Sequence, residues 1–132
     1  MTLFVDASAL VAIMAEEPER DELIDQLGAA PDILWSPTSC WESVSGLRRA
    51  RKLTAVAARR EVEQAATDLG LRLVSVGEAE LRLALDAYEL YGRNSGHQAR
   101  LNFGDCFAYA CAKTNKAHLL YKGDDFTHTD LA

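Results

Sequence analysis

Short apolar segments of β-type composition alternate along this chain with segments of helical periodicity, and this order constrains the fold more than any other feature. Strands are predicted at 2–6, 32–36, 71–76 and 118–123. Helices are predicted at 8–17, 19–30, 36–52, 54–70, 77–92 and from Phe103 onward. Strands that alternate with helices form parallel sheets covered on both faces, so the expected fold class is a three-layer α/β/α with a central parallel sheet.

We expect a single domain, 1–132, because the length is typical of one domain and neither an internal repeat nor a Pro/Gly-rich linker divides the chain. The longest mainly apolar run, 9–15, is too short to cross a bilayer, and no basic region precedes it as in a signal peptide. The three cysteines lie in apolar surroundings and are odd in number, which favours core thiols in a reducing compartment. A cytoplasmic protein without a membrane segment is therefore expected.

Acidic residues stand where the predicted strands end. Asp6 closes the first strand, Glu42 lies in the helix after the second, and Asp124 and Asp125 follow the last. Asp105 lies in the first turn of a helix that is apolar on nearly all sides and is therefore predicted to be buried. Ligands of parallel sheets bind beyond the carboxyl ends of the strands, so the sequence predicts a carboxylate cluster at this edge.

Each acid also has an explanation as a helix cap. Asp6, Asp105 and Asp125 each precede a helical or turn segment and can accept hydrogen bonds from free N–H groups there. Glu42 completes a capping box with Ser39, but Ser36 followed by proline offers a competing helix start in which Glu42 caps nothing. We favour the Ser36 start, which leaves Glu42 free for another role.

A shared cation explains all these acids together. Carboxylates brought close together repel, and their pKa values rise unless a cation neutralises them. Oxygen ligands suit a hard divalent ion, Mg²⁺ or Mn²⁺. Zinc is disfavoured, because the chain has no CxxC and its three histidines are scattered. Ser8 is most simply a helix-start serine, although its hydroxyl can also hold a metal-bound water, and Asn102 is expected to be a turn residue.

Four segments carry a resemblance to a known family: "FVDASALVAIMAEEPE", "SCWESV", "RLNFGDCFAYACAK" and "HLLYKGDDFTHTDL". With these segments the chain resembles the PIN-domain ribonucleases, most closely the VapC toxins of VapBC toxin–antitoxin pairs. By this resemblance Asp6, Glu42 and Asp105 match the metal-binding acids of the family. The fourth acid falls in "GDD", where Asp124 is our choice and Asp125 the alternate, since the second aspartate can instead cap the final turn.

The resemblance also implies a cognate VapB-like antitoxin, an RNA substrate of the tRNA or rRNA class, and a homodimer. The mechanism expected is metal-assisted hydrolysis of a phosphodiester. Asp6 and Asp105 are the expected direct ligands, Glu42 binds a second ion or orients water, and the fourth acid completes the site, with Ser8 and Asn102 in support. The apolar helices at 22–27 and 80–91 are the candidates for a dimer contact.

A net charge of −6 gives the chain no general affinity for nucleic acid, so RNA requires a local positive surface. Positive charge is concentrated in "RRARK", and the predicted RNA-binding residues are Arg48, Arg49, Arg51 and Lys52. The alternative is that this segment is simply a solvated helix face.

Two other functions are compatible with the sequence. An aspartyl-phosphate enzyme with Asp6 as nucleophile is one, but the second aspartate that haloacid-dehalogenase-like hydrolases use two positions later is here Ser8. A catalytically inactive α/β interaction module, in which the acids are caps and solvated charges, is the other. Saturable binding of Mn²⁺ separates the nuclease from such a module.

Overall fold

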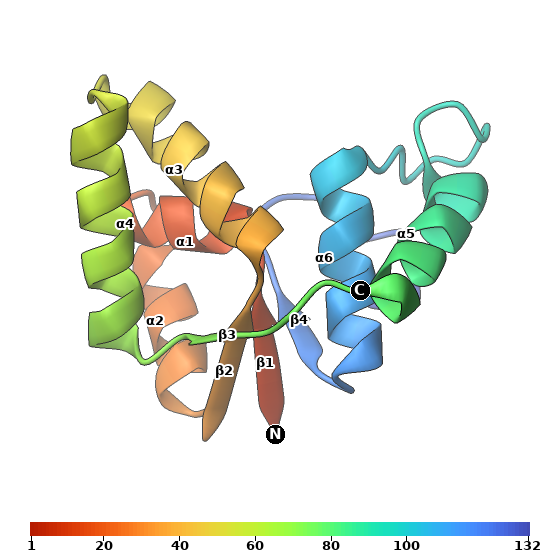
Figure 1. Ribbon diagram of the computed structural model, residues 1–132, viewed down its shortest axis with the longest axis horizontal. Helices are drawn as coiled ribbons and strands as arrows, with labels where there is room; N and C mark the ends of the chain where they lie inside the picture. The colour runs from red at the N-terminus through yellow and green to blue at the C-terminus, as the bar shows by residue number, and fades with distance from the viewer.

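The structure, a computed structural model, describes all residues from 1 to 132 and is a parallel sheet flanked by helices (Figure 1). This confirms the predicted α/β/α class. The elements in chain order are β1 (Thr2–Val5), α1 (Ala7–Met14), α2 (Arg20–Gly28), β2 (Asp32–Trp35), α3 (Pro37–Arg51), α4 (Ala55–Leu69), β3 (Arg72–Leu73), α5 (Glu78–Tyr91), α6 (Phe103–Thr114) and β4 (His118–Leu120).

The sheet has the strand order β3-β2-β1-β4, and every neighbouring pair is parallel. β1 is therefore central, with Phe4 in register with Leu34 of β2 on one side and with Leu119 of β4 on the other. Because all strands run the same way, the residues that follow β1, β2 and β4 emerge at one edge of the sheet.

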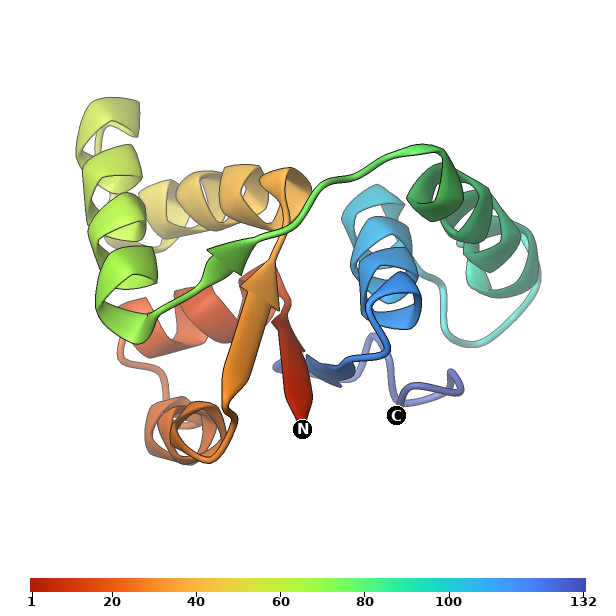
Figure 2. The same cartoon turned by 60° about the horizontal axis from the view of Figure 1, so that its bottom comes forward.

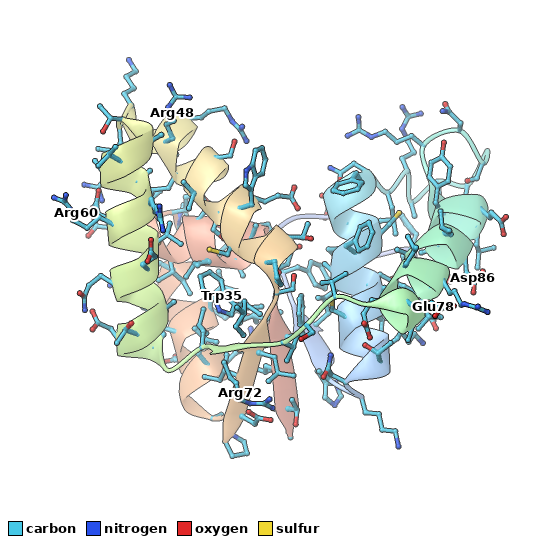
Figure 3. The ribbon with its side chains drawn as sticks, viewed as in Figure 1. Trp35, Arg48, Arg60, Arg72, Glu78 and Asp86 are labelled. Atoms are coloured by element: carbon cyan, nitrogen blue, oxygen red, sulfur yellow. The ribbon has the colours of Figure 1, made fainter.

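Successive side chains of β1 enter two different cores, as the period of two along a strand requires. Phe4 packs into the core formed with α5 and α6, whereas Leu3 and Val5 pack into the core formed with α1 to α4. Trp35 at the end of β2 also lies in the second core, beneath α3 (Figure 3). Figure 1 shows the two groups of helices on opposite sides of the sheet.

The helix starts at this edge of the sheet are fixed by local hydrogen bonds. Ser36 caps α3 through its side chain, which accepts from the Ser39 N–H, and Pro37 occupies the first turn. The Ser36 start favoured from the sequence is thus confirmed, and Glu42 lies inside α3 rather than in a capping box. Asn102, expected to be a turn residue, is in fact the N-cap of α6.

All four strands are shorter than the sequence indicated, β1 and β2 by one residue each and β3 and β4 by more. β3 is predicted over 71–76 but spans two exposed residues, although Val74 still donates to the Trp35 carbonyl at 2.8 Å. β3 is the edge strand, and the chain leaves it to cross the sheet toward α5 (Figure 2). β4 ends at Leu120, and the chain continues as turns to the C-terminus. The apolar residues of both segments pack into the core without extending the strands. Sequence alone does not distinguish these two roles.

None of the helices combines the length and the apolar character that a membrane crossing requires.

Candidate active site

Asp6 stands between the end of β1 and the start of α1, with only 7% of its surface exposed. Its Oδ2 accepts hydrogen bonds from the Ser8 backbone N–H at 3.0 Å and from the Ser8 hydroxyl at 2.6 Å. Asp6 is thus the N-cap of α1, as the cap interpretation expected. The Ser8 hydroxyl also accepts from the Lys122 N–H at 3.0 Å, so it joins the end of β1 to the segment that follows β4.

Asp105 lies in the first turn of α6 and is likewise 7% exposed. It is not the N-cap of α6. Instead it forms a reciprocal pair with Asn102, whose side chain accepts from the Asp105 N–H at 2.9 Å while Asp105 Oδ2 accepts from the Asn102 N–H at 3.0 Å. This pair fixes the carboxylate of Asp105 relative to the backbone at the start of the helix.

Glu42 extends from α3 across to α6, and its carboxylate lies against Gly104. A β-carbon at position 104 would fall 1.8 Å from Oε1 of Glu42, so only glycine leaves room for this carboxylate. The close approach explains the glycine in "FGD" and brings the acid of α3 to the first turn that carries Asp105. The sequence suggested that this glycine permits a close approach but not which residue approaches.

The two aspartates after β4 differ in their relation to the other acids. The charge of Asp125 is among the main influences on both Asp6 and Asp105. Asp124 and Asp125 are both exposed, and both line a shallow pocket of about 440 Å³ with Arg93 and Arg100 of the loop before α6. Asp125, the alternate to our choice of Asp124, is therefore the one of the two that the electrostatics link to the buried acids.

Burial and mutual repulsion raise the affinity of these acids for protons. Burial raises the pKa of Asp105 to about 7, the hydrogen bond from the Asn102 backbone opposes this, and the charges of Asp125, Asp6 and Glu42 add to it. Burial also raises the pKa of Asp6. The hydrogen bonds from Ser8 oppose this rise, and the charge of Asp125 adds to it. Burial raises the pKa of Glu42 as well, Asp6 adds to this rise, and Arg49 opposes it. Four carboxylates thus share one neighbourhood.

The chemistry of this group fits a hard divalent cation. All the donors are carboxylate oxygens, they come from four different elements of the chain, and ionising them together is unfavourable without positive charge. In the conformation described, no three acidic, histidine or cysteine side chains already form a ligand set for one ion. Asp6, Glu42, Asp105 and Asp125 are the residues that would hold a cation at this edge of the sheet.

The predicted RNA-binding residues do not share one face. Seven residues separate Arg49 from Glu42, close to two helical turns, so both lie on the same side of α3, and Arg49 influences the Glu42 carboxylate. Arg48 lines the groove between α3 and α4 near the far end of α3 (Figure 3). Arg51 is paired with Glu61 at 3.7 Å, and Lys52 is the exposed C-cap of α3. Arg49 is thus the member that faces the acids.

Sequence reasoning did not identify Arg93 and Arg100. They stand at the two ends of the loop between α5 and α6, and their side chains take part in none of the ion pairs of the protein. The loop is held by the Leu101 N–H, which donates to the Tyr91 carbonyl, and by the Ala99 N–H, which donates to His97 Nδ1. The sequence feature that could have identified them is their position, because one arginine stands at each end of a polar loop just before the helix that begins with "FGD".

Comparison with known proteins agrees with this fold. The PIN domain family matches residues 3–131. Ribonuclease VapC42 of Mycobacterium tuberculosis is 38% identical over 129 residues, which cover 98% of this chain and 96% of the relative. A VapC ribonuclease of Rhizobium meliloti is 40% identical over 139 residues, covering 97% and 98%.

Two solved structures have the same fold. A toxin–antitoxin complex from Klebsiella pneumoniae superimposes with a TM-score of 0.72 at 14% identity and covers 99% of this chain and 94% of its own. M. tuberculosis VapC20, described as a Sarcin-Ricin loop cleaving toxin, superimposes with a TM-score of 0.68 at 23% identity, covering 95% and 92%. The full-length match to the family and the identity to its curated members establish that this chain belongs to the PIN-domain family and, within it, to the VapC proteins.

Proposed function

We propose that this protein is a Mg²⁺- or Mn²⁺-dependent endoribonuclease, the toxin of a type II toxin–antitoxin pair, which hydrolyses phosphodiester bonds of RNA. One observation carries the proposal: the Glu42 carboxylate meets the first turn of α6 that carries the buried Asp105, and the charges of Asp6, Glu42 and Asp125 all act on Asp105. Relatives that match nearly the whole chain at 38–40% identity are named ribonucleases, which supports RNA as the substrate.

The cation would be held by Asp6 and Asp105, with Glu42 and Asp125 completing its surroundings. We assign the fourth position to Asp125 rather than Asp124, because the charge of Asp125 is among the main influences on both Asp6 and Asp105. When bound, such a cation lowers the pKa of a water molecule and neutralises charge that develops on the attacked phosphate.

The residues of the chain orient the acids and admit the substrate. Ser8 fixes Asp6 Oδ2 through two hydrogen bonds, and Asn102 fixes Asp105 through a reciprocal pair. These supports leave the acids little rotational freedom, so they are preorganised for a charged ligand. Gly104 leaves the space that Glu42 needs to reach the same region.

RNA would reach the acids between two sources of positive charge. Arg49 lies on the Glu42 side, and Arg93 and Arg100 lie on the Asp125 side, in the pocket that these arginines share with the aspartates. Because the chain carries a net charge of −6, these arginines are the groups that favour the approach of a polyanion near the acids. Arg48, Arg51 and Lys52 add positive charge at the C-terminal end of α3, on other faces than Arg49.

The partners proposed are a cognate VapB-like antitoxin and RNA of the tRNA or rRNA class. The similarity to a toxin–antitoxin complex supports the first, and the similarity to a Sarcin-Ricin loop cleaving toxin supports a ribosomal RNA loop. We also propose a cytoplasmic homodimer. Of the two apolar helices expected at the dimer contact, α2 buries Leu23 and Leu27 in its own core, whereas α5 leaves Leu81, Leu85 and Tyr88 exposed. α5 is therefore the better candidate.

The test is cleavage of a mixed RNA pool by the purified protein with Mn²⁺, Mg²⁺ or EDTA, together with calorimetric titration of Mn²⁺ into the metal-free protein. The proposal expects metal-dependent internal cleavage and saturable binding, and both should be lost in Asp6→Asn. The same titration on Asp86→Asn, which changes an exposed acid of α5 (Figure 3), serves as the control. RNA that stays intact with every metal, with no saturable binding, would leave an interaction module as the better description.

A further inference from the structure

Two large aromatic side chains stand exposed beside the candidate acids. Trp41 immediately precedes Glu42 on α3, Phe103 is the first residue of α6 two positions before Asp105, and each has 72% of its surface exposed. The protein's other tryptophan, Trp35, is only 6% exposed. Burying an aromatic side chain is strongly favourable, so two that remain in water at the rim of one site need an explanation.

Trp41 and Phe103 line the same pocket, and Glu42 lies in it. The pocket has a volume of about 310 Å³, and its remaining walls are Pro37 and Thr38. Its walls therefore come from the first two turns of α3 and the first residue of α6, two rigid elements, and not from loops. Phe103 packs against Phe107, with 5.0 Å between the ring centroids, and the indole of Trp41 makes no ring contact within the protein.

We propose that Trp41 and Phe103 form a stacking site for an unpaired nucleobase of the RNA substrate, next to the phosphodiester that is hydrolysed. The inference rests on the proposed function and adds to it how a single-stranded segment of RNA is held. Aromatic side chains bind unstacked bases in this way, and each such contact contributes about 1–3 kcal/mol.

A nucleotide suits this pocket better than an apolar protein surface does. A protein side chain seated between Trp41 and Phe103 would cover Glu42, a half-buried acid, and desolvate it further without supplying positive charge. A nucleotide places its flat base against the aromatic rings and its phosphate toward the acids and their cation. The N-terminal ends of α3 and α6, which line the pocket, favour that negative charge.

The chain offers a matched control for each aromatic residue. Leu73 shares with Trp41 the groove between α3 and α4 but does not line the pocket that contains Glu42. Tyr88 shares with Phe103 the groove between α5 and α6 and likewise lies outside that pocket. Both control side chains are exposed, 59% for Leu73 and 51% for Tyr88, so truncating them also removes apolar surface from water.

The experiment measures binding of a short fluorescein-labelled single-stranded RNA by anisotropy in EDTA, over a salt series, and kcat/KM for its cleavage in Mn²⁺. Trp41→Ala and Phe103→Ala should each weaken binding by roughly 5–150-fold, the equivalent of 1–3 kcal/mol, with an unchanged salt slope because no phosphate contact is lost. Trp41→Phe should retain most of the affinity. Leu73→Ala should bind like the wild type. So should Tyr88→Ala, with light scattering to show that it is still a dimer, because Tyr88 also lies on the α5 face proposed for the dimer contact.

Two further measurements separate stacking from other roles. RNA that contains 2-aminopurine should show quenched fluorescence on the wild type and not on the Trp41→Ala/Phe103→Ala variant, whose melting temperature should match the wild type. Variants that bind RNA as tightly as the wild type but no longer dimerise, or no longer bind the antitoxin, would overturn the stacking site and leave the proposed function intact. A wild-type protein that neither binds nor cleaves RNA would overturn both.

Discussion

The carboxylate of Glu42 rests on the backbone of Gly104, so that helices from opposite sides of the sheet meet at one acid and one glycine. α3 packs on the core with α1, α2 and α4, and α6 packs on the core with α5. A β-carbon at position 104 would overlap the Glu42 carboxylate. The nearest atoms all belong to that carboxylate, so the clash is with a side chain and not with the backbone.

Gly104→Ala should therefore displace Glu42 while the fold persists. Glu42 is the end of a flexible side chain and can move, and alanine favours a helix over glycine by about 1 kcal/mol, so the melting temperature should change little. Cleavage of RNA should fall by roughly 100-fold, as expected for a misplaced group at the site. Gly28→Ala is the control, because a β-carbon there meets nothing within 4 Å. Cleavage by Gly104→Ala at the wild-type rate would remove Glu42 from the mechanism.

Asp105→Asn tests whether this residue only completes the capping box with Asn102 or also binds a cation. Asparagine retains an oxygen that can accept from the Asn102 N–H, so the cap survives and the metal-free protein should be as stable as the wild type or slightly more so. Activity should fall by more than the roughly 10–100-fold loss typical of residues that only support a ligand. Calorimetric titration of Mn²⁺ and cleavage of mixed RNA are the measurements, with Asp86→Asn alongside. A variant that melts normally and cleaves normally makes Asp105 a cap alone.

The pH dependence of stability provides a second measurement on Asp105, made in EDTA. Its pKa is about 7 in the folded protein and 3.8 in the reference state, so the folded protein holds the proton more tightly. The wild type should thus lose stability relative to Asp105→Asn as the pH rises from about 4 to about 7, and the difference should stay constant above that. At about 1.4 kcal/mol per pKa unit, the difference amounts to a few kcal/mol at most. Urea denaturation of both proteins across this range measures it; a difference independent of pH would contradict the burial of an acid here.

Arg49 should matter more for RNA than Arg48, because Arg49 shares a face of α3 with Glu42 and Arg48 points into the groove toward α4. Arg49→Glu should reduce cleavage strongly and lower the salt slope by about 0.7 for each phosphate contact with a single strand that is lost. Arg48→Glu makes the same change of net charge and should have the smaller effect, and Mn²⁺ affinity should be nearly unchanged in both. If the two variants had equal effects, RNA would respond to the total positive charge at the C-terminal end of α3, and not to the side of the helix on which the charge lies.

Light scattering at tens of micromolar protein tests the dimer. The wild type should give about twice the 14.5 kDa of one chain, and Leu85→Glu should give the single-chain mass, because a charge in the exposed apolar face of α5 opposes its burial. Val56→Glu, which alters an exposed apolar residue of α4, should remain a dimer. A wild type of 14.5 kDa would count against the dimer.

Most of the fold could be predicted because hydrophobic periodicity and capping residues within a segment define its secondary structure. Periodicity located nearly every element, and the Ser36-Pro37 pair fixed the start of α3. Asp105 was correctly placed in a buried first turn, but its partner Asn102 was interpreted as a turn residue, since a capping pair and a turn use the same residue types.

Relationships across the sheet were not predictable in the same way. Nothing local to Gly104 indicates that Glu42, from a different helix, fills the space beside it. The preference for Asp125 over Asp124 depends on how the last loop folds back, and the loop arginines become relevant only once they lie near that loop. Likewise Trp41 and Phe103 share a pocket because α3 and α6 meet there.

The Ser8 hydroxyl bears on when the site comes into being during synthesis. It orients Asp6 and receives the Lys122 N–H, a contact between positions separated by 114 residues. A ribosome adds Lys122 and the "GDD" aspartates more than 100 residues after Ser8, and those residues must also leave the exit tunnel before β4 can pair with β1. A nascent chain therefore carries Asp6 and Glu42 long before it carries a complete set of acids, so the site assembles only once the segment after β4 has emerged and packed beside β1.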